Sequence, residues 1–145
     1  MGRRTKAREC AFQMLYQWQL SREPMERVME AFWRVRSTTG ETRILAERLA
    51  AGAQACTPES DAAIAGAATN WRLDRIAPVD HTILRLGAYE LMKETGTPPA
   101  VILDEAVELA KRFGEADSPA FVNGVLDAIR RRVRQEAPAG GGPGE

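Results

Sequence analysis

The stretch that decides the fold is Val79-Asp80-His81-Thr82-Ile83-Leu84-Arg85-Leu86-Gly87-Ala88-Tyr89-Glu90-Leu91-Met92-Lys93. Its apolar and small residues cover most of the circumference of a helix; they are Val79, Ile83, Leu84, Leu86, Gly87, Ala88, Leu91 and Met92. A helix that is apolar nearly all round is normally buried among other elements. We therefore expect residues 79–93 to form the central helix of the protein.

Helical patterns continue on both sides of this stretch. Apolar residues recur there at spacings of three and four, which places them on one face of each helix. The predicted helices cover residues 7–20, 25–35, 44–56, 57–71, 101–113 and 118–133. No run alternates apolar and polar residues between turn dipeptides, so no sheet is expected. The predicted fold class is therefore all-α, a compact single-domain bundle of about seven helices.

Local signals place several helix ends. Thr57-Pro58-Glu59 predicts a helix start with Thr57 as its cap, and Ser118-Pro119 predicts another with Ser118 as its cap. Gly96 and the prolines that follow it mark the end of the central helix. Residues 72–78 are expected to form a short connector.

The composition is that of an ordinary globular protein. Of the 145 residues, 44% are hydrophobic and 28% are charged. No stretch reaches the roughly 18–20 uninterrupted apolar residues of a membrane span, and no apolar segment follows the basic N-terminus as in a signal peptide. Cys10 and Cys56 lie far apart without a CxxC motif, so we expect buried thiols rather than a disulfide or a metal site. These features predict a cytoplasmic protein that does not enter a membrane.

The residues that catalysis needs are scarce. His81 is the single histidine, and its place at the start of the central helix favours a surface or capping role. Asp104, Glu105 and Glu108 form an acidic group, but the Glu-x-x-His pairs of di-metal helical bundles are missing, which favours a solvated helix face. Neither a Walker A motif nor GxGxxG is found. We expect a protein that is not an enzyme and that has no cofactor and no metal site.

Charge is balanced overall but uneven along the chain. There are 20 basic and 20 acidic side chains, which argues against binding of nucleic acid through net charge alone. Cations gather at the N-terminus, in Arg3, Arg4, Lys6 and Arg8. Such a run is either a solvated terminus or a short RNA-binding arm, whose phosphate contacts would make binding sensitive to salt.

Phe121 offers a second candidate contact for nucleic acid. It lies in the first turn of the last predicted helix, beside Asp117, Ser118 and Pro119. An aromatic face at this position could stack on a nucleobase. The same spacing fits a core anchor of that helix equally well, and both interpretations stay open at this point.

Four segments, taken together, resemble the NusB family. They are Arg3-Arg4-Thr5-Lys6-Ala7-Arg8-Glu9-Cys10-Ala11 running into Gln13-Met14-Leu15-Tyr16, the stretch 79–91, Asp104-Glu105-Ala106-Val107-Glu108-Leu109-Ala110-Lys111-Arg112-Phe113, and Ser118-Pro119-Ala120-Phe121-Val122-Asn123-Gly124-Val125-Leu126-Asp127. Their order and spacing also match, so the resemblance covers nearly the whole chain. It implies two packed helical sub-bundles. It also implies an antitermination factor that pairs with the ribosomal protein NusE, binds the boxA element of nascent ribosomal RNA and joins the RNA polymerase antitermination complex.

The resemblance also assigns residues to these partners. It implies that RNA contacts the basic arm and the region around the last helix, through Arg3, Arg4, Lys6, Arg8, Lys111, Asp117 and Phe121. Tyr16 and Asp80 are expected on the partner side of the fold, with Asp80 against a basic partner. The expected module spans residues 1–136, with a basic flexible arm at 1–6 and a disordered Gly- and Pro-rich tail at 137–145. Thr5 interrupts the basic run, which suggests a weak RNA binder whose surface NusE completes.

Two other classes of protein remain as alternatives. NusB-like domains also occur at the N-terminus of RNA cytosine methyltransferases, but no cofactor-binding domain follows in this sequence, which ends at Glu145. The second alternative is a helical module that does not contact RNA, because Trp18, Trp33 and Trp71 could form a self-association surface. Some NusB-like proteins resemble homodimers that cover the RNA face, so a homodimer and an RNA-bound state could compete.

Overall fold

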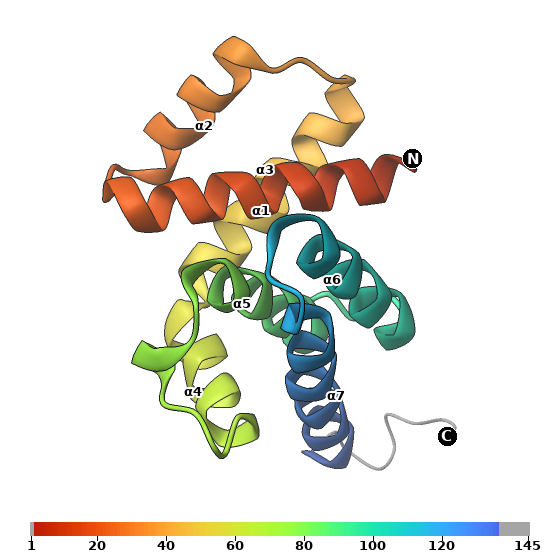
Figure 1. Ribbon diagram of the computed structural model, residues 1–145. Coiled ribbons are helices and arrows are strands. Elements are labelled where there is room, and N and C mark those ends of the chain that lie inside the picture. The colour runs from red at the N-terminus through yellow and green to blue at the C-terminus, as the bar shows by residue number, and fades with distance from the viewer. Residues whose placement is uncertain (1, 137–145) are drawn as a thin grey trace.

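The computed structural model describes residues 2–136 and contains seven α-helices, one short 3₁₀ helix and, within those residues, no strand (Figure 1). The elements are α1 (Arg3–Ser21), α2 (Met25–Val35), α3 (Gly40–Ala55), α4 (Thr57–Ala67), η1 (Leu73–Arg75), α5 (Pro78–Lys93), α6 (Pro99–Phe113) and α7 (Ser118–Glu136). The all-α class and the seven predicted helices are confirmed. The tail predicted at residues 137–145 lies outside the described residues.

Helix α5 is the central element, as its apolar circumference predicted. It packs against α1, α3, α4, α6 and α7, and Figure 1 shows it between the other helices. Its most deeply buried apolar side chains are those of Ile83, Leu84, Leu86 and Ala88. Burying each of the large ones contributes about 1.5–3 kcal/mol. The core of the protein is therefore built around this one helix.

The helices form two groups, which agrees with the two sub-bundles that the resemblance implied. Helices α1, α2 and α3 make up the first group, and α4, α5, α6 and α7 make up the second (Figure 1). The first group rests mainly on the packing of α1 against α3, and the second on α6 and α7 packed against each other and against α5. Helices α1 and α3 also reach α5, so the two groups share one core.

Two glycines allow helices to approach α5 closely. A Cβ atom at Gly87 of α5 would lie 2.7 Å from Cδ1 of Leu126 in α7. A Cβ atom at Gly52 of α3 would overlap the ring of Tyr89 in α5. A side chain at either position would push α5 away from its neighbour in a closely packed core. This explains why glycine stands within these helices despite its low helix propensity.

Most helix ends lie near their predicted positions, but the two predicted caps are wrong. Thr57 is the first residue of α4, and its hydroxyl donates to the carbonyl oxygens of Ala53 and Gln54 at 3.2 and 2.8 Å. Ser118 is likewise the first residue of α7; it is buried, and its Oγ accepts a hydrogen bond from the N–H of Glu115 at 2.9 Å. In both cases the hydroxyl bonds to the preceding turn instead of capping the helix that follows.

Both cysteines are free and buried, as predicted. Burial raises the pKa of the Cys10 thiol and that of the Cys56 thiol. Because the thiolate is the reactive form, both side chains are poor nucleophiles at neutral pH. They serve the protein as small core residues.

A buried ion pair joins the two groups of helices. Arg8 of α1 donates from Nε to both carboxylate oxygens of Glu90 in α5 at 3.0 Å, and from Nη2 to Oε1 at 2.8 Å. Only 3% of each side chain is exposed. Burial raises the pKa of Glu90, and the Arg8 guanidinium opposes that rise. Neither group can be removed without leaving the other unpaired in the core.

Removing one partner of this pair should strongly destabilise the protein. We expect Glu90→Ala to lower the free energy of unfolding by about 3–5 kcal/mol, because Arg8 would be left charged and unpaired in an apolar site. As a control, Glu30→Ala breaks the exposed Glu30–Arg34 pair of α2 and should change this free energy by less than about 0.5 kcal/mol. Urea denaturation at pH 7 measures both values. A loss of less than about 1 kcal/mol for Glu90→Ala would contradict this account.

Candidate functional site

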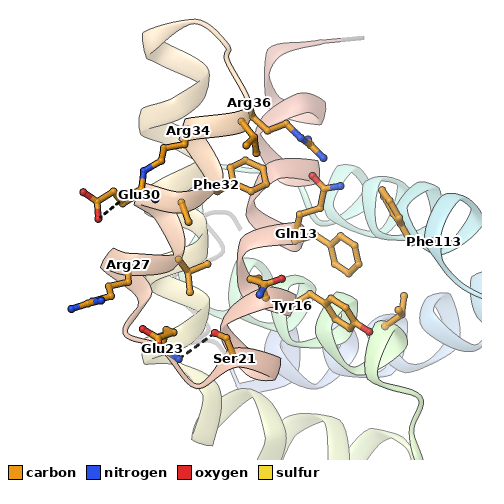
Figure 2. Close-up of a pocket in the computed structure, with 16 residues that line it drawn as sticks. Gln13, Tyr16, Ser21, Glu23, Arg27, Glu30, Phe32, Arg34, Arg36 and Phe113 are labelled. Carbon is orange, nitrogen blue, oxygen red and sulfur yellow. Dashed lines mark hydrogen bonds and ion pairs between the residues drawn. The ribbon is translucent and has the colours of Figure 1, made fainter.

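A groove of about 700 Å³ crosses the outer side of α1. Helix α2 forms one wall, and Phe113 of α6 stands at the opposite side (Figure 2). Val79 of α5 also lines the groove. Its lining thus comes from both groups of helices. The groove therefore takes this shape only when the two groups are packed together.

Aromatic side chains dominate the floor of the groove. Phe12 packs against Tyr16 and Phe113, with ring centroids 6.1 and 5.0 Å away. On α2, the guanidinium of Arg36 lies 5.0 Å from the ring centroid of Phe32. Figure 2 shows Tyr16 and Phe113 on one side of α1, and Phe32 and Arg36 on the other. Aromatic and arginine side chains are the types that contribute most of the energy at protein interfaces.

Polar groups surround this floor. The groove is edged by the charged residues Glu23, Arg27, Glu30, Arg34 and Arg36. The side chain of Gln13 points into the groove from α1 (Figure 2), and its Oε1 atom is buried without a hydrogen-bond partner among the described residues. An apolar centre inside a charged rim is the usual anatomy of a protein-binding surface.

Of the two residues predicted to contact a protein partner, one lines this groove and the other follows a lining residue in the sequence. Tyr16 lines the groove and is half-buried. Asp80 follows Val79, which also lines the groove, in the first turn of α5. Only 9% of Asp80 is exposed, and its Oδ1 atom has no hydrogen-bond partner within residues 2–136. A buried acceptor without a partner is costly, so a donor from a partner protein would remove that cost.

The predicted basic arm belongs to a helix. Helix α1 begins at Arg3, so residues 3–6 are not the flexible segment that was expected. Arg3 forms an ion pair with Glu41 of α3. Arg4 is exposed and Lys6 is half-buried, and neither forms an ion pair within the described part of the chain. The unpaired N–H groups and the dipole of a helix N-terminus add to the attraction that these cations exert on an anion.

Arg8 does not share this surface. Its side chain is buried against Glu90, as described above, and so does not reach solvent. The assignment of Arg8 to RNA does not fit this geometry. The sequence around Arg8 does not show that it is buried while Arg4 is exposed, because its burial depends on Glu90, which α5 places beside it.

A second surface runs from α1 over α6 to the start of α7. Thr5 donates a hydrogen bond to Glu105 of α6 at 2.8 Å. Beside it, a hollow over α6 and α7 is lined by Asp104, Glu105, Val107, Glu108, Lys111, Pro119, Ala120 and Asn123. Lys111 is exposed and pairs with Glu108 at 3.3 Å. The local charge around Lys111 is therefore negative, which disfavours a phosphate at this position.

The structure supports the interpretation of Phe121 as an anchor of α7, and stacking of this ring on a nucleobase stays a prediction. Asp117 just before α7 is exposed, whereas Phe121 is half-buried and packs onto the core. Its ring contacts Trp71, with centroids 5.7 Å apart and planes inclined by 64°. Phe121 thus anchors α7 and at the same time supports a more exposed aromatic ring.

A polar network ties α1, α4 and α5 together. Arg85 donates to both carboxylate oxygens of Asp61 at 2.8 and 2.7 Å, and to Oε1 of Gln19 at 2.7 Å. His81 Nε2 lies 2.8 Å from Asp61 Oδ1, and Gln19 also donates to Thr82 at 2.7 Å. Burial alone would raise the pKa of Asp61, but the hydrogen bonds from Arg85 and His81 outweigh it and hold this pKa well below its usual value. The single histidine is thus a structural partner of Asp61.

Several residues of these surfaces were missed by sequence reasoning. The sequence did not predict a binding role for Phe32, Arg36 or Phe113, which line the groove. Their signal was weak, because an aromatic residue at helical spacing is usually a core residue. Trp71 was noticed as an apolar group, but its contact with Phe121 was not predicted.

The described residues, 2–136, offer neither a metal site nor a membrane-spanning helix. No group of three or more His, Cys, Asp or Glu side chains is placed to hold a metal ion in that range. No helix in it has the length and hydropathy needed to cross a membrane. The groove, the basic end of α1 and the Trp71–Phe121 pair define a small helical module with surfaces suited to binding other macromolecules.

Comparison with known proteins identifies the family. Residues 5–131 match the NusB family, and the chain belongs to it. It is 50% identical over 133 residues to the transcription antitermination protein NusB of Sorangium cellulosum (strain So ce56), with 92% of this chain and 95% of that protein covered. It is 38% identical over 136 residues to the transcription antitermination protein NusB of Pseudothermotoga lettingae, with 94% and 96% covered.

Solved structures show the same fold. NusB of T. maritima superposes with a TM-score of 0.81 at 33% sequence identity, over 90% of this chain and 92% of that chain. The crystal structure of antitermination factors NusB and NusE in complex with double-stranded RNA contains a chain that superposes with a TM-score of 0.82 at 28% identity. That match covers 91% of this chain and 98% of the other.

The Asp61 network should make stability depend on acid pH. A carboxyl group whose pKa is lowered by folding stabilises the protein above its unfolded value, about 3.9, and loses this contribution as the pH falls toward the folded value. We expect Asp61→Asn to lower the free energy of unfolding at pH 7 by about 1.5–3 kcal/mol. Between about pH 5 and pH 2.5, the wild type should lose more stability than this variant.

Urea denaturation over this pH range measures the difference. Asp74→Asn is the matched control, because Asp74 is exposed and pairs with Arg72 at 3.4 Å only. The free energy of unfolding of this control should depend on pH as that of the wild type does. Parallel acid profiles for the wild type and Asp61→Asn would show that the network does not hold the carboxylate.

Proposed function

We propose that this chain is a transcription antitermination factor that binds the boxA element of nascent ribosomal RNA together with NusE and supports processive transcription by RNA polymerase. The observation that carries the proposal is the likeness, over nearly the whole chain, to proteins of that name. A solved relative in complex with NusE and RNA supports the choice of partners. We place the protein in the cytoplasm and regard it as a binding factor rather than an enzyme.

The first turns of α1 are the proposed RNA surface. Arg4 and Lys6 are not held by ion pairs among the described residues, and both lie where the helix dipole favours anions. The Arg3–Glu41 pair is mostly exposed on both sides, and exposed pairs contribute little to stability. An RNA phosphate can therefore take the place of Glu41 beside Arg3 at little cost.

The groove over α1 is the proposed NusE surface. Its aromatic floor offers apolar area, and Tyr16 lies within it. The unpaired oxygens of Gln13 and Asp80 give a partner with N–H or cationic donors two buried acceptors to satisfy. Satisfying buried polar groups confers specificity, because a partner without matching donors leaves the desolvation cost unrelieved. These acceptors favour a partner that brings N–H or cationic donors to this part of the groove.

RNA binding can be tested by fluorescence anisotropy with a boxA-like oligonucleotide and a scrambled control, with and without NusE and at two salt concentrations. We expect selective, salt-sensitive binding that tightens when NusE is present. In the isolated chain, Arg4→Ala should reduce the slope of log K against log salt by about 0.7, which corresponds to one phosphate contact on a single strand. Arg34→Ala on α2 should leave the slope unchanged. No selective binding under any of these conditions would refute the proposal.

The groove can be tested by calorimetric titration with purified NusE. We expect Tyr16→Ala to weaken NusE binding about tenfold or more, because tyrosines at interface centres often contribute about 2 kcal/mol. Leu20→Ala on the same helix is the control, since Leu20 is 59% exposed and should leave the affinity unchanged. Thermal melting of both variants verifies that they are folded. Equal NusE affinities for Tyr16→Ala and the wild type would remove the groove from the NusE surface.

A further inference from the structure

Trp71 differs from the other exposed large hydrophobic side chains of the described residues. Those others are aliphatic: Leu20, Val35, Ile44 and Val101. Trp71 is 51% exposed, whereas Trp18 and Trp33 are partly buried against the core. A large aromatic ring left half in solvent forgoes much of the apolar burial that it could contribute to folding. The exposure of Trp71 therefore indicates a binding role.

The ring of Trp71 is held in a defined position. It lies between α4 and η1, and its backbone N–H donates to the carbonyl of Ala68 at 3.0 Å. On the other side, Ile76 is buried and donates from its N–H to the carbonyl of Leu73 at 3.2 Å. Phe121 packs against the ring at an inclination of 64°. The connector between α4 and α5, residues 68–77, is thus anchored on both sides of Trp71, and about half of Trp71 stays exposed.

Positive charge accompanies this ring. Arg72 and Arg75 are both exposed on the same connector. Arg72 is paired with Asp74 at 3.4 Å, and both side chains of this pair are largely in solvent, so the pair is weak. Arg75 forms no ion pair with the described side chains of residues 2–133. An exposed aromatic ring with arginines on the same segment is suited to binding single-stranded nucleic acid.

We propose that Trp71 stacks on an unpaired base of the bound RNA, with Phe121 behind it, while Arg72 and Arg75 contact the neighbouring phosphates. The base contact then belongs to Trp71, and Phe121 positions the indole. Stacking on an aromatic ring and cationic contacts to the backbone together recognise an unpaired strand. This inference rests on the RNA binding proposed above and adds a specific contact to it.

Tryptophan fluorescence tests the contact directly, because a base stacked on an indole quenches its emission. The chain has three tryptophans, and only the emission of Trp71 should respond to a boxA-like oligonucleotide. Trp71→Phe should lose most of the quenching yet keep its affinity within about threefold, since a phenyl ring still stacks. Trp71→Ala should weaken binding by at least about fivefold. Leu20→Ala, which removes another exposed hydrophobic side chain, should match the wild type.

Annealing the oligonucleotide to its complement should abolish the quenching, because no base is then free to stack. If the wild type binds RNA selectively but Trp71→Ala binds equally well and quenching persists in Trp71→Phe, the stacking contact is overturned and the proposed function stands. If the wild type binds no RNA, both are overturned. If Trp71→Ala dissociates a dimer in sedimentation analysis and RNA affinity is unchanged, the surface serves self-association, which also overturns the inference.

Discussion

The rest of the structure depends on the ion pair between Arg8 and Glu90, which fixes the position of α1 on the central helix, α5. Taking two charges out of water costs several kcal/mol per ion, and a close two-oxygen geometry offsets part of that cost. The pair therefore defines position more than it adds stability. A shift of α1 by one residue would turn the guanidinium away from α5, because neighbouring positions on a helix face different directions. In the observed register, Glu9 meets Arg112 of α6 at 2.5 Å.

This position of α1 places both proposed binding surfaces on one rigid element. Arg4 lies in the first turn of α1 and Tyr16 lies twelve residues later, about 18 Å along the helix. The Arg8–Glu90 pair is located between them and fixes the rotation of the helix about its axis. A partner in the groove contacts Val79 and Phe113 as well as α1, so it stabilises the same position of α1 that places the cations. The proposed partner binding and the proposed RNA binding would thereby be linked through one helix.

The helices could be predicted from sequence because burying one face of a helix leaves a local pattern in the chain. The roles of single residues could not, because they depend on distant partners. Arg8 meets Glu90 across 82 positions, and nothing near Arg8 distinguishes it from the exposed Arg4. The groove is lined by four helices and therefore leaves no local pattern. The caps failed for another reason: a hydroxyl such as that of Thr57 can bond to the turn before it as well as to the turn after it.

Electrostatics alone would make this chain a poor ligand for RNA. Its formal net charge is zero, and Lys111 shares its hollow with Asp104, Glu105 and Glu108. The cations proposed to contact phosphate lie at the start of α1 and on the connector that carries Trp71. Contacts to phosphate are sequence-independent and weaken with salt, whereas stacking requires a base that is free of its complement. A neutral protein with the proposed contact would therefore gain selectivity from stacking on Trp71, which requires an unpaired base, rather than from its net charge.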